Sequence, residues 1–126
     1  MKILLDTNAL LWLLQDSPLL SVSAREHIEK ATEITVSEVS LWEISIKVSI
    51  GKLLPIPELF ATIHDLGFRR LNLRDAHLSA YENLPLIHRD PFDRMLVAQA
   101  LSENLALLTS DTILEKYGAK IISANA

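Results

Sequence analysis

The chain has 126 residues, a formal net charge of −4 and no cysteine. The length fits one domain with a substantial core, and the lack of cysteine excludes disulfides and thiolate chemistry. The negative charge argues against a protein that coats nucleic acid through a basic surface. No apolar segment reaches the roughly 18 residues that span a bilayer, and Asp6 interrupts the first apolar run. We therefore expect a cytoplasmic protein without a membrane partner.

Short apolar or β-branched runs alternate along the chain with stretches of helical periodicity. The predicted strands are 3–5, 34–36, 68–73, 105–109 and 120–123. The predicted helices are 7–15, one capped by Ser21 or Ser23 that ends near Lys30, 37–50, 57–67 with Pro57 in its first turn, 75–83, 90–103 and 111–117. Strands separated by helices are joined by right-handed crossovers, which gives a mainly parallel sheet of about five strands. No repeat or linker divides the chain, so residues 1–126 are expected to form a single α/β domain.

Acidic residues follow three of the predicted strands. Asp6 comes directly after the first strand, Asp111 after the fourth, and Glu43 lies in the helix after the second. Asp93 lies in the first turn of the helix that leads to the fourth strand, where Asp90 can act as the cap. Taken singly, each is explained as a helix cap, a first-turn acid or a solvated helix acid. Those explanations do not account for why all four acids are expected at the carboxyl edge of one parallel sheet, which is where such sheets bind ligands.

Several carboxylates that lie close together repel one another, so such a cluster needs protons or a cation. Hard oxygen ligands favour Mg²⁺ or Mn²⁺. A cation held this way lowers the pKa of a bound water and stabilises charge on phosphate oxygens, while another acid orients or deprotonates that water. Arg89 and Arg94 flank Asp93, and arginine suits bidentate contact with phosphate, although Arg94 could instead pair with a neighbouring acid.

Four segments together resemble the PIN-domain family, and within it the VapC-type toxins of bacterial toxin–antitoxin pairs. They are LDTNALLW at 5–12, SEVSLWEI at 37–44, HRDPFDRMLVAQA at 88–100 and TSD at 109–111. The resemblance covers nearly the whole chain, and its central segment is the most specific. It implies a three-layer α/β/α fold and a Mg²⁺- or Mn²⁺-dependent endoribonuclease.

The resemblance also implies a set of site residues. Position by position, the catalytic and metal-binding acids are Asp6, Glu43, Asp93 and Asp111, and the small polar supports are Thr7, Asn8 and Ser110. The family often has a basic residue where this chain has Ser110.

The partners implied by the resemblance are an RNA substrate, a second copy of the chain in a homodimer, and a cognate antitoxin. The antitoxin's extended C-terminal segment would place a basic side chain near Asp6 and Asp93. Two alternatives within the same superfamily are a nuclease that acts on DNA and an inactive PIN module that only binds. A receiver-type signalling module fits poorly, because Thr7 follows Asp6 where that class has a second acid, and no acid ends the third strand.

Overall fold

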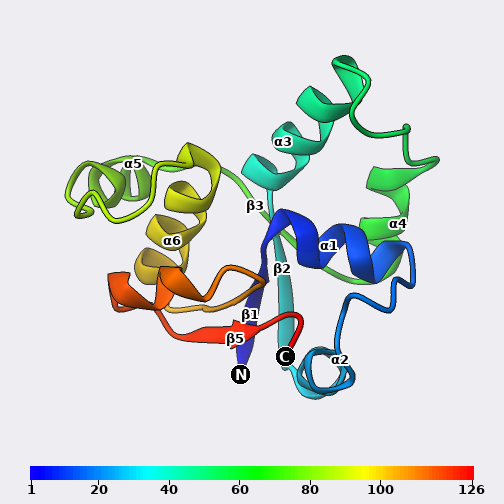
Figure 1. The fold of residues 1–126 in the computed structure, drawn as a ribbon, viewed down its shortest axis with the longest axis horizontal. Coiled ribbons are helices and arrows are strands. Elements are labelled where there is room, and N and C mark those ends of the chain that lie inside the picture. The colour runs from blue at the N-terminus through cyan, green and yellow to red at the C-terminus, as the bar shows by residue number, and fades with distance from the viewer.

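The computed structural model describes residues 1–126 and contains a five-stranded sheet between two layers of helices (Figure 1). The strands are β1 (Lys2–Leu5), β2 (Glu33–Ser37), β3 (Arg69–Leu71), β4 (Ala106–Thr109) and β5 (Ile121–Ser123). The helices are α1 (Thr7–Leu14), α2 (Val22–Lys30), α3 (Glu38–Ser49), α4 (Leu59–Asp65), α5 (Asp75–Glu82), α6 (Pro91–Glu103) and the 3₁₀ helix η1 (Thr112–Tyr117). The predicted class and order of elements are confirmed. None of the helices combines the length and apolar character that a bilayer span requires.

All neighbouring strands are parallel, in the order β3-β2-β1-β4-β5. The central strand is β1, whose last residue, Leu5, lies opposite Val36 of β2 and Leu108 of β4. The strand order reverses at β1, because β2 and β3 extend the sheet on one side while β4 and β5 extend it on the other. The crevice beyond the carboxyl ends of the strands at such a reversal is where open α/β sheets bind ligands.

The two faces of the sheet support two separate cores. Ile3 and Leu5 of β1 face a cluster that includes residues of α1, α2, α3 and α4. Leu4, between them, points to the opposite face and packs in a cluster with residues of α6 and η1. α5 lies outside α6 (Figure 1). Because each layer buries its own apolar stripe against the sheet, the starts of α1, α3 and α6 are held at the carboxyl edge.

Three predicted boundaries are wrong in detail. α4 begins at Leu59 rather than at Pro57, because Glu58 has a left-handed backbone (φ 57°) that cannot continue a helix. The segment after β4 forms a 3₁₀ helix from Thr112, capped by Asp111, rather than an α-helix from that residue. The third strand pairs only over Arg69–Leu71. Of the two candidate caps of α2, Ser21 is the one used, since its Oγ accepts from the amide of Ala24 at 3.0 Å.

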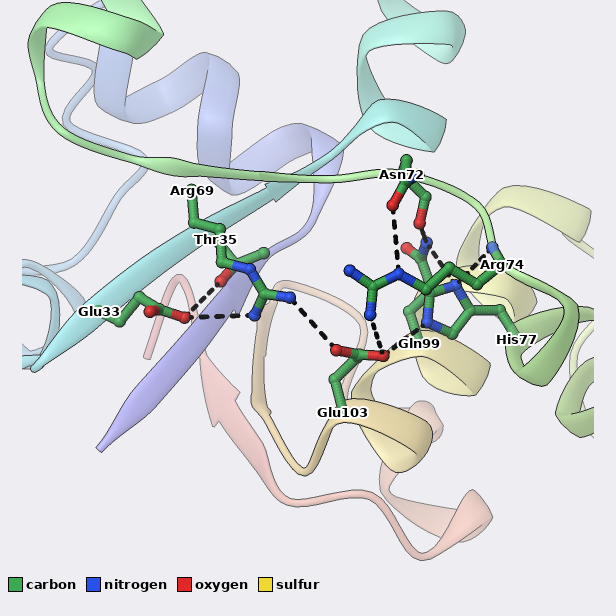
Figure 2. Close-up of polar contacts among 8 residues, drawn as sticks. All are labelled: Glu33, Thr35, Arg69, Asn72, Arg74, His77, Gln99 and Glu103. Atoms are coloured by element: carbon green, nitrogen blue, oxygen red, sulfur yellow. Dashed lines mark hydrogen bonds and ion pairs between the residues drawn. The ribbon is translucent and has the colours of Figure 1, made fainter.

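A polar network ties the edge strand β3 and helix α5 to α6 (Figure 2). Its centre is Glu103, whose Oε2 lies 3.0 Å from Nε2 of the fully buried His77. Arg69 joins Glu103 at 3.3 Å and Glu33 at 3.4 Å, and Arg74 lies 3.5 Å from Glu103. The hydrogen bond from His77, followed by that from Arg69, lowers the pKa of Glu103. These charged residues therefore pair with one another and stabilise the fold. They lie away from the carboxyl end of β1.

Gln99 connects this network to the sheet edge. Its Oε1 accepts from the Ser37 hydroxyl at 2.6 Å, and its Nε2 contacts Nδ1 of His77 at 3.3 Å. The Ser37 hydroxyl oxygen in turn caps α3 by accepting from the amide of Val39 at 3.0 Å. Ser37, His77 and Gln99 are all fully buried. The start of α3 is thus fixed relative to α6.

We expect Gln99→Met to keep the side-chain volume but to lower the free energy of unfolding by about 1–3 kcal/mol. The reason is that the buried Ser37 hydroxyl would then lack its acceptor. Urea denaturation measures the change. Ser102→Ala, at an exposed position of the same helix, is the control and should stay within about 0.5 kcal/mol of wild type. Equal effects of the two substitutions would contradict a stabilising role for Gln99.

Candidate active site

Asp6 is both the cap of α1 and a buried acid at the end of the central strand. Its Oδ1 accepts from the amide of Ala9 at 2.7 Å, and its side chain is almost entirely buried. Burial raises the pKa of Asp6, and the charge of Glu43 raises it further. Hydrogen bonds from the Thr109 side chain and from the amides of Ala9 and Ser110 oppose that rise. The capping role and the site role therefore belong to the same carboxylate.

Glu43 is held inward by neighbours on two helices. Its Oε1 accepts from the Thr7 hydroxyl at 2.5 Å, and its Oε2 lies 3.7 Å from Nζ of Lys47, one turn further along α3. The side chain of Glu43 is only 15% exposed. These contacts exclude the simpler explanation of Glu43 as a solvated helix acid.

Asp93 and Asp90 divide two tasks at the start of α6. Asp90 is the cap, because its Oδ1 accepts from the amides of Phe92 at 2.8 Å and Asp93 at 3.3 Å. The carboxylate of Asp93 is left to face the other acids. Burial, followed by the charges of Asp90 and Asp6, raises the pKa of Asp93 to about 7, against the opposing effect of His88. The capping role predicted for Asp90 is confirmed.

A hollow of about 130 Å³ lies between the starts of α1 and α6 and the side of α3, and no apolar residue lines it. Its lining consists of Asp6, Thr7, Asn8, Glu43, Lys47, Asp90 and Asp93. Burial is the main reason that the pKa values of Asp6 and Asp93 are raised, and the charges of the neighbouring acids, which outnumber the single lysine, raise them further. Clustered carboxylate oxygens are the ligands that hard divalent cations prefer, so the lining fits Mg²⁺ or Mn²⁺.

Asp111 lies beside this hollow and not in its lining. Its Oδ2 is 2.7 Å from Nε2 of His88, and the same nitrogen is 3.7 Å from Oδ2 of Asp93. Ligand atoms of His88, Asp93 and Asp111 all lie within 4.8 Å of one another. Asp93 therefore links the acids of the hollow to Asp111. Ser110 contributes through its backbone amide to Asp6.

Comparison with protein families matches residues 3–120 to the family described as PIN domain. The chain belongs to the PIN domain family. A search of curated protein sequences finds no match.

Among solved structures, VapBC2 from Rickettsia felis bound to a promoter DNA fragment is similar at 15% identity and a TM-score of 0.73, over 97% of this chain and 98% of that one. DNA-bound VapBC from Salmonella typhimurium is similar at 18% identity and 0.70, over 97% of both chains. A toxin–antitoxin complex from Klebsiella pneumoniae is similar at 18% identity and a TM-score of 0.64, again over 97% of both chains. At these identities the likeness concerns the fold.

The two arginines that flank Asp93 have different surroundings in this PIN domain. Arg94 is only 5% exposed, and its Nη1 donates to the carbonyl of Pro85 at 2.8 Å and to the Tyr117 hydroxyl at 3.1 Å. Its guanidinium also lies 4.8 Å from the ring centroid of Tyr81. These contacts explain Arg94 as a structural residue that anchors the loop before α6. Arg89 is exposed and forms no ion pair.

Three contacts of the acids in this PIN domain were not predicted from its sequence. Lys47 could have been found, because it follows Glu43 by one helical turn. Thr109 lies in the segment TSD that carries the resemblance, but nothing in the sequence indicated the hydrogen bond of its side chain to Asp6. The sequence placed His88 beside Asp93, but its contact with Asp111, 23 residues later, depends on the tertiary fold.

Proposed function

We propose that this chain is a Mg²⁺- or Mn²⁺-dependent endoribonuclease that hydrolyses RNA phosphodiester bonds and acts as the toxin of a toxin–antitoxin pair. The observation that carries the proposal is the hollow at the end of β1, which Asp6, Glu43 and Asp93 line without any apolar neighbour. The raised pKa values of Asp6 and Asp93 support it. Carboxyl groups that hold their protons more tightly than usual release those protons when a cation binds in their place. Membership of the PIN domain family agrees with a nuclease.

Each acid would have a distinct task. Asp6 and Asp93 would hold the cation. Asp111, which contacts His88, would be the third ligand. When bound, the cation would lower the pKa of a water and neutralise charge on a phosphate oxygen. Glu43, which contacts Thr7 and Lys47, would accept a proton from the attacking water.

Arg89 is the group we assign to the phosphate backbone. It is exposed, lies between His88 and Asp90 in the loop that leads to the acidic hollow, lines a separate cavity together with His88, and has no acidic partner that would compete. The rings of Trp42 and Phe92, which are next in sequence to Glu43 and Asp93, lie 5.3 Å apart, and Trp42 is exposed. Exposed aromatic rings accept stacked bases, which favours single-stranded RNA over a duplex whose bases are paired.

The partners we propose are a second copy of the chain and a cognate antitoxin. Support comes from the similar structures, which include VapBC and toxin–antitoxin complexes. A groove of about 610 Å³ between α3 and α4, lined mainly by apolar residues such as Ile44, Val48 and Ile56, has the character needed by an amphipathic segment. An arginine or lysine of that segment would be attracted to the net negative charge around Asp6 and Asp93.

One experiment tests the enzymatic proposal against its alternatives. Purified protein is incubated with single-stranded RNA, duplex DNA and flap DNA, each with Mn²⁺ and with excess chelator. Cleavage of RNA alone, abolished by chelator, is expected. Cleavage of DNA would favour the DNA nuclease, and no cleavage of any substrate would favour the inactive binding module.

The partner proposal has separate tests. Light scattering on the isolated chain should report a dimer. Co-expression with the neighbouring open reading frame should recover a small basic-tailed protein that inhibits cleavage. A strictly monomeric protein with no recovered partner and no toxicity on expression would remove the toxin proposal but leave the nuclease proposal intact.

A further inference from the structure

His88 is the one histidine that faces the acids, and two roles are open to it. Its Nε2 lies 2.7 Å from Oδ2 of Asp111 and 3.7 Å from Oδ2 of Asp93. An imidazole nitrogen this close to two carboxylates is either a metal ligand, which needs a free lone pair, or a hydrogen-bond donor, which needs a proton. The other ring nitrogen decides between these roles.

Nδ1 of His88 accepts a hydrogen bond from the backbone amide of Asp90 at 3.0 Å. A backbone amide always carries its hydrogen, so Nδ1 must present a lone pair. A neutral imidazole has a single N–H, which is therefore on Nε2 and is directed at Asp111. The backbone amide of His88 donates to the Tyr117 hydroxyl at 2.8 Å, which holds the loop in place. While the Asp90 contact lasts, Nε2 has no lone pair for a cation.

Asp111 needs such a donor more than the other acids do. Asp6 is buried and held by an amide at 2.7 Å, whereas the side chain of Asp111 is 38% exposed. Its other oxygen, Oδ1, accepts only a longer hydrogen bond, from the amide of Ile113 at 3.3 Å. Without His88, the Asp111 carboxylate could turn toward solvent and away from Asp93.

We propose that His88 is a positioning residue: it donates Nε2–H to Asp111 and holds that carboxylate against Asp93, and it is not itself a metal ligand. This inference rests on the proposed nuclease function. Hydrogen-bonding partners of metal ligands typically change metal affinity by about 10–100-fold when they are removed. His88 should therefore affect the affinity for the cation without touching it.

Two substitutions separate the donor from the loop contact. His88→Asn keeps an oxygen near the position of Nδ1 that can accept from Asp90 but has nothing that reaches Asp111. His88→Gln loses that acceptor, but its terminal amide can reach the position of Nε2 and donate. Mn²⁺ affinity, measured by calorimetry, should fall about 10–100-fold in His88→Asn and stay within a few-fold of wild type in His88→Gln. Equal losses in both variants, or no loss in either, would overturn the proposal.

The tautomer provides a second readout that involves no catalysis. Ring ¹⁵N shifts of His88, recorded at pH 9 in the metal-free protein and again with Mg²⁺, should show a protonated Nε2 and an unprotonated Nδ1 in both. A proton on Nδ1 in either state would overturn the proposal. Wild-type protein that binds no Mn²⁺ would count against the proposed function, and the metal-free spectrum would still decide whether His88 donates to Asp111.

Discussion

Asp6→Asn should reduce RNA cleavage by at least about 100-fold, because it removes one charge from the hollow while keeping the side chain's shape. The asparagine oxygen can still accept from the amide of Ala9, so α1 keeps its cap. Single-turnover cleavage of single-stranded RNA in Mn²⁺ measures the loss. Wild-type cleavage in the variant, or cleavage by the wild type in excess chelator, would refute the metal-dependent proposal.

The same variant should also lose the stabilising effect of metal. A cation that binds only the folded state raises the free energy of unfolding by about 2.7 kcal/mol at a free concentration of 100 Kd. Thermal melts with and without Mn²⁺ should therefore differ clearly in the wild type and much less in Asp6→Asn. An identical shift in both proteins would place the bound metal at another site.

Asp93→Asn should abolish cleavage while making the metal-free protein more stable at neutral and alkaline pH. Burial, together with Asp90 and Asp6, raises the pKa of Asp93 from 3.8 to about 7. The folded state consequently binds more protons than the unfolded state between these values, and stability falls as the pH rises through that window. Asparagine, which stays neutral, avoids this loss.

The stabilisation by Asp93→Asn should therefore be near zero at about pH 4, grow as the pH rises toward 7, and then level off. Its ceiling is about 4 kcal/mol, since each pKa unit corresponds to about 1.4 kcal/mol. Solvent that reaches the 22% exposed carboxylate makes the measured value smaller. Urea denaturation of both proteins at pH 4, 6 and 8 without metal gives the difference, in which the titrating groups that lie far from Asp93 cancel.

Asp90→Ala is the matched control for this prediction. Asp90 caps α6 through two backbone amides, so its removal should lower the free energy of unfolding by about 1 kcal/mol. Opposite signs of the stability change at pH 8 would support the assignment of Asp93 to the site and Asp90 to the cap. A stabilised Asp90→Ala and a destabilised Asp93→Asn would mean that the two roles are exchanged.

Local sequence determined most of the fold and the identity of the acids. Apolar runs such as Ile3–Leu5, followed at once by a helical pattern, predict parallel strands joined by helices, because each buried strand needs a covering layer on both faces. Because the carboxyl ends of parallel strands lie at one edge of the sheet, we expect Asp6, Glu43 and Asp93 to lie close together. The structure confirms that they line one hollow. Helix caps at Ser37 and Asp90 are equally local, since a cap depends only on the next three residues.

Tertiary structure alone decided the contacts that set the chemistry of the acids. The hydrogen bond of Thr7 to Glu43 spans 36 positions, that of His88 to Asp111 spans 23, and that of Ser37 to Gln99 spans 62. No local pattern encodes such pairs, because they depend on how two layers pack across the sheet. Burial is equally non-local: it removes Arg94 from solvent and raises the pKa of Asp93, and both effects come from neighbours on several elements.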